Sequence, residues 1–187
     1  MGLHSYSYAE YAALETMSPE KHEFFDGDIL LLARGDAEHA ALSAAIGEEL
    51  WRASRSRGCA YSSELRIFVE SVALATFADA SVVFGPLQQH EPSPNATAVN
   101  PGILAEVTSS WSEEYDRGLK AEFYRTIPTL REYIIVSHRE RRITAHVRGN
   151  DGEWHTSEAG PGGSVAIPSL GASLLVDAVY DGIIVSV

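Results

Sequence analysis

The chain has 187 residues, 45% of them hydrophobic, which suits one compact domain (residues 1–187) with a substantial core. Fourteen Lys and Arg against 26 Asp and Glu give a formal net charge of −12, which opposes non-specific adhesion to nucleic acid or anionic membranes, so any DNA contact must be local or assisted by a metal ion. The single cysteine, Cys59, excludes an internal disulfide and a thiolate zinc cluster.

The N-terminal region predicts a short helix followed by a β-hairpin. The helix runs from Ser7 to about Met17, because Pro19 disfavours helical conformation in the residue before it. The stretch HEFFDGDILLLA is typical of two extended segments joined at Asp26-Gly27, a dipeptide that readily adopts positive φ angles. The N-terminus lacks a basic segment followed by an apolar core, and no apolar run approaches a membrane span. We therefore expect a soluble, cytoplasmic protein.

A long helix is predicted from Ala37 to about Arg57, with Asp36 as its N-cap and Gly58 as its stop. One face carries the apolar residues Leu42, Ile46 and Leu50. His39, near the helix start, is interpreted as a cap-region or packing residue rather than a ligand. Three arginines gather near the helix end, Arg52, Arg55 and Arg57. They suit the helix C-terminal dipole, and the alternative is a phosphate-binding patch.

Three strands are predicted next, at residues 59–62, 65–69 and 77–84, because these segments are rich in Val, Phe and Ile. The third contains Asp79, an acid within a segment otherwise suited to the core. Residues 85–101 are rich in Gly, Pro, Gln, Asn and Ser and predict a long surface loop.

The stretch from residue 102 to 125 predicts a buried strand followed by a helix. Glu106 is the one carboxylate of the apolar strand, which ends after Val107. Ser110 and Glu113 have the spacing of a capping box, which predicts the helix start. The helix would carry a polar stripe and an apolar stripe, formed by Asp116, Lys120 and Tyr124 and by Leu119, Phe123 and Ile127.

The C-terminal third predicts mostly antiparallel strands. A buried strand is expected at residues 132–137, and two alternating segments follow at 142–148 and 153–157 around the turn Asn150-Asp151-Gly152. A short helix is predicted at residues 174–179.

Asp79 and Glu106 lie on two predicted strands that could run side by side, which would bring their carboxylates together. Two converging carboxylates are a ligand set for Mg²⁺ or Mn²⁺, and Lys120 could stabilise the negative charge that develops near such an ion. For either acid alone, a hydrogen bond at a strand end is the simpler interpretation, and Lys120 could merely pair with Asp116. The ordered trio favours a metal-dependent site.

Nearly the whole chain resembles the Uma-type restriction endonuclease family, a branch of the PD-(D/E)XK nuclease superfamily. The resemblance includes HEFFDGDIL, GCAYSSELRI, FADASVV and PSLGASL, and its most specific piece is AEVTSSWSEEYDRGLKAEFYR. It implies an α/β (α+β) fold with a restriction-endonuclease-like core, in which helices flank a mixed central β-sheet, with an N-terminal β-hairpin. It also implies a DNA substrate, a magnesium or manganese cofactor and a homodimer.

The resemblance also implies site residues. Asp79 matches the motif's aspartate and Glu106 its second acid. The lysine expected two residues later is replaced by Thr108, and Lys120 matches a lysine that has migrated to the following helix. The Pro-Ser that usually follows the strand is Ser110-Trp111 here, and the proline that usually precedes the aspartate is Ala78, so these departures concern the backbone more than the chemistry.

Three further residues are possible supporting groups. Glu23 matches a family acid that could complete the site, and its alternative is an exposed strand residue opposite Asp28. Glu64 matches another family acid, and a surface ion pair with Arg66 or a neighbour explains it equally well. Tyr124 shares the polar stripe and could orient Lys120.

Two hypotheses of different classes result. The first is a metal-dependent endonuclease that hydrolyses phosphodiester bonds of DNA, with Asp79 and Glu106 holding Mg²⁺ and Lys120 assisting. The alternative is a nuclease-fold module with weak or no catalysis that binds nucleic acid or protein, which the charge of −12 favours.

Overall fold

The computed structural model describes residues 5–33, 35–91 and 96–185. Its N-terminal part confirms the predicted helix and hairpin: α1 (Tyr8–Met17) is followed by β1 (His22–Phe25) and β2 (Asp28–Leu31). Ser7 caps α1 in a reciprocal capping box with Glu10. Asp26 and Gly27 form the hairpin turn with φ angles of 45° and 96°, which their residue types tolerate.

A five-stranded sheet extends from this hairpin in the order β2-β1-β5-β4-β7. Its other strands are β4 (Arg66–Val69), β5 (Leu74–Phe77) and β7 (Thr97–Ala98), and a 3₁₀ turn, η1 (Glu70–Val72), joins β4 to β5. β7 lies within the predicted loop 85–101, of which residues 92–95 are outside the described part of the chain.

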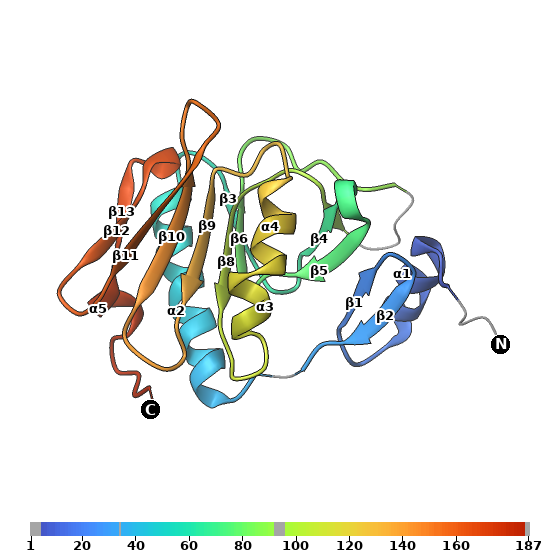
Figure 1. The fold of residues 1–187 in the computed structure, drawn as a ribbon, viewed down its shortest axis with the longest axis horizontal. Coiled ribbons are helices and arrows are strands. Elements are labelled where there is room, and N and C mark those ends of the chain that lie inside the picture. The colour runs from blue at the N-terminus through green and yellow to red at the C-terminus, as the bar shows by residue number, and fades with distance from the viewer. Residues whose placement is uncertain (1–4, 34, 92–95, 186–187) are drawn as a thin grey trace.

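A six-stranded mixed sheet forms the centre of the molecule, in the order β11-β10-β9-β8-β6-β3 (Figure 1). Its strands are β3 (Cys59–Ser62), β6 (Ala80–Val83), β8 (Pro101–Val107), β9 (Glu132–Val136), β10 (Ile143–Arg148) and β11 (Trp154–Ala159). β8 and β9 are parallel, whereas the other neighbours are antiparallel. All seven residues of β8 are buried, because both faces of this strand are covered.

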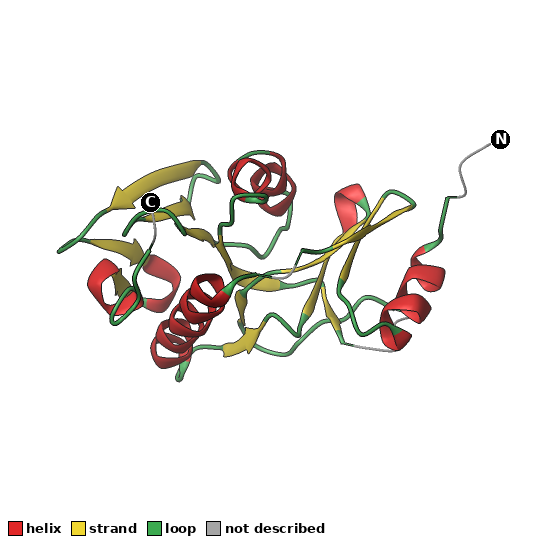
Figure 2. Cartoon of the chain, turned by 90° about the horizontal axis from the view of Figure 1, so that it is seen from below, coloured by secondary structure: helices red, strands yellow, loops and turns green. Residues whose placement is uncertain are grey.

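Helices cover the two faces of this sheet (Figure 2). The long helix α2 (Ala37–Ser54) packs Leu42, Ile46 and Leu50 against one face, as its apolar spacing predicts. The helices α3 (Glu113–Arg117) and α4 (Leu119–Arg125) lie on the other face, where Ala121 and Tyr124 join the second core cluster. This arrangement confirms the predicted mixed sheet flanked by helices.

Two predicted elements are wrong in their boundaries. The strand predicted at residues 77–84 is divided between β5 and β6, which belong to different sheets, so Asp79 lies at the crossover between them. The helix predicted from Ser110 begins only at Glu113, without the capping box, and breaks at Gly118. Leu119 of the predicted apolar stripe is 48% exposed, whereas Phe123 is half-buried and Ile127, just after α4, is buried. The residues of the polar stripe are buried as well.

The C-terminal region adds the two-stranded sheet of β12 (Ser164–Ile167) and β13 (Ala172–Leu175), joined by the 3₁₀ turn η2 (Pro168–Leu170). The helix predicted at residues 174–179 is correct only in its second part, α5 (Val176–Val179). Among the helices of the described residues, none is both long and apolar enough to cross a membrane.

Candidate active site

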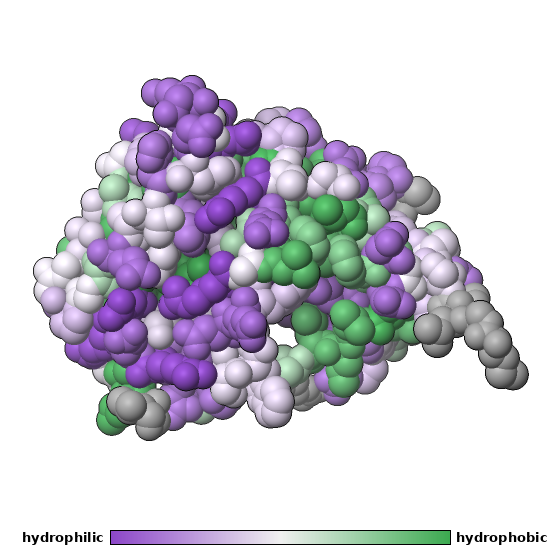
Figure 3. All heavy atoms as spheres, in the orientation of Figure 1, coloured by the Kyte–Doolittle hydropathy of each residue, from purple (hydrophilic) through white to green (hydrophobic). Residues whose placement is uncertain are grey.

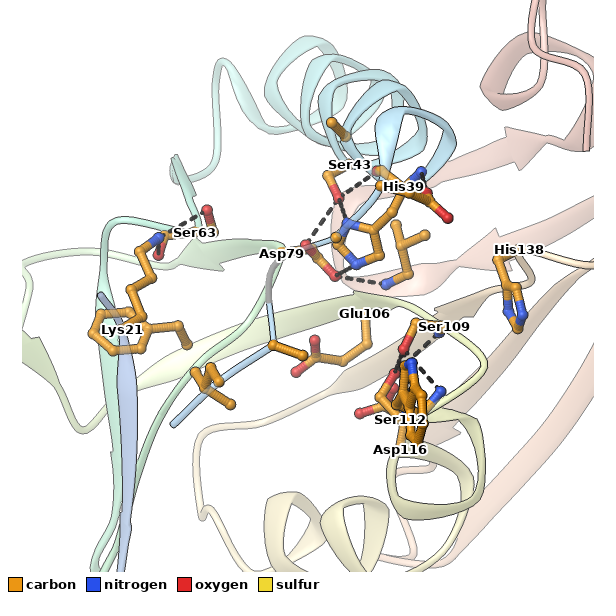
Figure 4. A pocket seen from close by; sticks show the side chains of 18 of the residues that line it. Lys21, His39, Ser43, Ser63, Asp79, Glu106, Ser109, Ser112, Asp116 and His138 are labelled. Carbon is orange, nitrogen blue, oxygen red and sulfur yellow. Dashed lines mark hydrogen bonds and ion pairs between the residues drawn. The ribbon is translucent and has the colours of Figure 1, made fainter. Parts of the chain in front are cut away.

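A cavity of about 890 Å³ opens where the crossover between β5 and β6 meets the end of β8 and the start of α2. The carboxylates of Asp79, Glu106 and Asp116 line it, together with Lys120. Figure 4 shows the Asp79 carboxylate facing Ser43 and His39 of α2, with Glu106 on the neighbouring strand. The cavity therefore collects charged groups from elements that are far apart in the sequence.

Strand pairing brings the two predicted acids together. β6 and β8 are antiparallel neighbours with Ala80 opposite Ala105, so Asp79, just before β6, reaches the end of β8 beside Glu106. The backbone N–H of Val107 donates a hydrogen bond of 2.8 Å to Asp79 Oδ2. The prediction that these two strands lie side by side is confirmed.

The helix α2 supplies two partners of Asp79. Ser43 Oγ donates to Asp79 Oδ1 at 2.8 Å, and His39 Nε2 lies 3.4 Å from Asp79 Oδ2. Burial alone would raise the pKa of Asp79, but the hydrogen bonds from His39, Val107 and Ser43 outweigh it and hold the pKa below its usual value. The same contact raises the pKa of His39 against the opposing effect of burial.

His39 therefore has a role at the site beyond the cap region assigned to it from the sequence. Its backbone N–H does bond the N-cap residue Asp36 at 2.8 Å, but its ring faces Asp79. The one local signal was its spacing of four residues from Ser43, which places both side chains on one face of α2.

Lys120 points back toward the end of β8, as predicted. Its Nζ lies 2.8 Å from Glu106 Oε1 and 3.6 Å from Asp116 Oδ1, and its side chain is 6% exposed. Tyr124 donates to the same Glu106 oxygen at 2.8 Å, so Tyr124 orients Glu106 directly. Lys120 therefore makes both of the contacts considered from the sequence, with Asp116 and with Glu106.

Thr108 occupies the position where the resemblance places an ordinary lysine. Its side chain is completely buried, and its Oγ1 lies 2.8 Å from Nδ1 of His138, another residue that lines the cavity. The lysine of the site therefore comes from α4, the second helix after β8.

The site carries more negative than positive charge. Burial raises the pKa of Glu106 to about 8, and the charges of Asp116 and Asp79 act in the same direction while Lys120 opposes them. Burial would lower the pKa of Lys120, but attraction to Glu106 and Asp116 outweighs it and leaves the lysine charged. One buried ammonium thus serves several carboxylates.

This donor set suits a divalent cation. Asp79 and Glu106 offer carboxylate oxygens in the same cavity, and the excess of negative charge would be relieved by a cation such as Mg²⁺ or Mn²⁺. Within the described residues, no group of three or more His, Cys, Asp or Glu side chains is arranged to hold an ion. Two carboxylates leave most coordination positions of such an ion to water, and Mg²⁺ commonly keeps several waters.

Glu23 lies beside this site and is buried, with 4% of its surface exposed. It stands opposite Leu30, not Asp28, so the alternative of an exposed strand residue is wrong. Its Oε1 accepts a hydrogen bond of 2.7 Å from Tyr115, which lines the cavity, while its buried Oε2 has no hydrogen-bond partner among the described residues. Glu23 therefore ties the hairpin to α3.

Glu64 is the one supporting residue placed away from the site. Its side chain is 80% exposed, does not line the cavity and pairs with Lys21 at 2.8 Å. The surface ion pair is therefore its role in the structure, with Lys21 in place of the expected Arg66.

Comparisons with known proteins agree with this architecture. A family model described as "Uma2: Putative restriction endonuclease" matches residues 8–177. Two Synechocystis sp. relatives are "Uncharacterized protein slr1290", 29% identical over 93% of this chain and 90% of that protein, and "Uncharacterized protein sll1609", 28% identical over 80% and 85%.

A solved structure shows the same fold. It is the crystal structure of "a putative nuclease belonging to DUF820" from Anabaena variabilis ATCC 29413, which superimposes with a TM-score of 0.71 over 92% of this chain and 98% of that chain. The sequences are 14% identical, so the likeness concerns the fold alone.

Proposed function

Because this chain belongs to the Uma2 family, whose description names a restriction endonuclease, we propose that it is a metal-dependent endonuclease that hydrolyses phosphodiester bonds of DNA. The observation that carries this proposal is the buried contact of 2.8 Å between Lys120 and Glu106, beside Asp79 and inside one cavity. Burying charged groups costs folding free energy, so several charged groups that converge in one cavity are typical of a catalytic centre.

Each residue of the site has a distinct part in the proposal. Asp79 and Glu106 would hold Mg²⁺ or Mn²⁺, which supplies neutralisation of phosphate charge and activation of a bound water. Ser43 and the Val107 N–H fix the Asp79 carboxylate, and Tyr124 fixes Glu106. These bonds keep the oxygens in place without reorganisation.

Lys120 is the cationic group of the proposed mechanism. Its ammonium has three donors, and its contacts with Glu106 and Asp116 hold it at the cavity wall. It would stabilise the negative charge that develops on the phosphate oxygens. Tyr115 and Glu23 would position this wall from the hairpin side, because their hydrogen bond joins α3 to β1.

A cleavage assay on plasmid and single-stranded DNA with Mg²⁺ or Mn²⁺ tests the proposal. We expect Glu106→Gln and Lys120→Met each to lower the rate by about 100-fold or more, the size of effect seen when one charge-stabilising group is removed. Glu140→Gln, which changes a charge outside this cavity, is the matched control. Activity that survives both site substitutions would exclude this set of residues.

The alternative is an interaction module with little catalysis. Figure 3 shows apolar side chains over the hairpin and over α4 on one face. Leu30 and Leu31 of β2 and Leu119 of α4 are each about half exposed or more. Such a patch favours a protein partner, including a second copy in the expected homodimer. Thermal stabilisation by Mg²⁺ that Asp79→Asn abolishes would contradict this alternative, and light scattering measures the dimer.

A further inference from the structure

Trp111 stands out on the rim of the cavity because its side chain is exposed and does not belong to the core. It is 87% exposed and lies between β8 and α3, among the residues that line the cavity. In the family resemblance this position usually holds a small residue, so the indole is a feature of this chain. An indole exposed to this extent on the wall of a cavity is available to a ligand.

The loop that carries Trp111 is fixed by its own hydrogen bonds. Ser109 Oγ accepts from the backbone N–H groups of Trp111, at 3.3 Å, and of Ser112, at 3.0 Å. Ser112 Oγ in turn accepts from the Ser109 N–H at 3.0 Å. These hydrogen bonds fix the conformation of the turn that carries the indole. Less backbone entropy is therefore lost when the indole contacts a ligand.

The cavity offers little free positive charge for phosphates. Lys120 is engaged with Glu106, and Lys21 pairs with Glu64 at 2.8 Å. Among the described residues that line the cavity, none is an arginine. Together with the net charge of −12, this means that the protein's own side chains attract phosphates weakly, so affinity for a nucleic acid beyond what a bound metal ion supplies must come from another source.

We propose that Trp111 stacks on an unpaired nucleobase, and that the substrate of this site is single-stranded DNA or an unpaired segment of DNA. The inference rests on the proposed nuclease function for the identity of the ligand. Stacking on an aromatic ring needs a free base face, which a single strand offers and a base-paired duplex does not. A cavity of about 890 Å³ is large enough to admit a nucleotide beside the carboxylates.

A fluorescence titration tests the proposal without requiring cleavage. In a Glu106→Gln background with Trp51→Phe and Trp154→Phe, Trp111 is the only tryptophan. We expect oligothymidylate to quench its emission, and a duplex of equal length to bind at least about tenfold more weakly. Gel analysis of the oligonucleotide after each titration verifies that it stays intact.

Substitution of the indole gives the matched comparison. In the Glu106→Gln background with the other tryptophans present, we expect Trp111→Ala to weaken single-strand binding by about tenfold or more, and Trp111→Phe to retain most of the affinity. Trp51→Ala is the control, because Trp51 is 49% exposed but does not line the cavity.

The outcomes separate this inference from the proposed function. Unchanged emission together with unchanged affinity of Trp111→Ala would overturn the stacking role, even if the cleavage assay succeeds. Quenching and single-strand preference without any cleavage would support the stacking role and contradict the nuclease proposal. A change of oligomeric mass in Trp111→Ala, with DNA binding unaltered, would identify Trp111 as a protein contact and overturn the inference.

Discussion

Lys120 is the residue on which the stability of the site depends, because it is the buried cation between Glu106 and Asp116. Removing one partner of a buried ion pair leaves an uncompensated charge, so we expect Lys120→Met to lower the free energy of unfolding by about 3 kcal/mol. Urea unfolding monitored by circular dichroism measures this change. Glu106 can relieve part of the cost by keeping a proton, since burial already raises its pKa to about 8.

The double variant Lys120→Met/Glu106→Gln shows whether the loss comes from charge or from packing. Neutralising Glu106 removes one of the carboxylates left unpaired, so we expect the double variant to be more stable than Lys120→Met alone. Arg142→Met, at an exposed ion pair, should change stability by less than about 1 kcal/mol and serves as the control. Strictly additive losses in the double variant would contradict the charge explanation.

Gly118 lies at the break between the helices α3 and α4, and α4 carries Lys120. Its φ and ψ angles are −104° and −105°, and a Cβ atom there would lie 2.9 Å from the backbone oxygen of Glu114. We expect Gly118→Ala to lower the free energy of unfolding by about 1–2 kcal/mol, because the backbone contact cannot be relieved by a rotamer change. Thermal unfolding of the purified variant checks this.

Gly47 gives the matched comparison within α2. Apart from Gly47 itself, its two chain neighbours and the nearby backbone of α2, no heavy atom of the described residues lies within 4 Å of an added Cβ. Gly47→Ala should therefore raise the free energy of unfolding by about 0.5–1 kcal/mol, because alanine has the higher helix propensity. If both alanine variants gained stability, the break at Gly118 would not be imposed by its lack of a side chain.

Elements with strong local patterns were predictable from the sequence. The hairpin follows from Asp26-Gly27, and α2 follows from its apolar spacing between Asp36 and Gly58. The helix after β8 was predicted correctly in the direction of Lys120, but local spacing did not predict its late start at Glu113 or its break at Gly118. Tertiary contacts bury Lys120 and Tyr124 against the acid Glu106 on the inner face.

The site was predictable only where a residue type conflicts with its surroundings. Asp79 and Glu106 stand out as acids in apolar segments, and both line the cavity. His39 and Ser43 meet Asp79 through the packing of α2 on the sheet, and such contacts leave no pattern in a single sequence. Trp111 was visible only as a departure from the family, because exposure depends on the fold.

His146 makes the stability of the whole molecule sensitive to acid. Burial lowers its pKa to about 4, and the positive charges of Arg125 and Arg117 act in the same direction, whereas Glu158 opposes them. Its Nδ1 lies 3.1 Å from the Arg125 guanidinium, which must donate to a neutral imidazole. In the unfolded chain the pKa returns to about 6.5, so the unfolded state binds more protons between these values.

Stability should therefore fall as the pH decreases from about 6.5 to 4, with His146 contributing a loss on the order of 3 kcal/mol. Urea unfolding at several pH values measures this slope, and His146→Gln should flatten it. His155→Gln is the control, because the His155 side chain is 67% exposed. An unchanged slope in His146→Gln would show that other groups cause the acid sensitivity.

The charge of the whole molecule predicts how DNA binding responds to salt. A net charge of −12 and paired cavity lysines leave few phosphate contacts, so the logarithm of the binding constant for single-stranded DNA should fall against the logarithm of salt concentration with a slope of only about −1 to −2. Titrations from low to physiological salt measure it.

The arginines at the end of α2 are the side chains that could make the salt slope steeper than predicted. Arg52 is paired with Glu48 and Glu49, whereas Arg55 lies 3.9 Å above the Trp51 ring and Arg57 donates to the Ser169 carbonyl. Because these contacts occupy the three side chains, Arg55→Ala/Arg57→Ala should leave the salt slope unchanged. A slope of about −5 or steeper that this variant reduces would identify the α2 arginines as a phosphate-binding surface, and DNA would then bind by charge rather than by stacking.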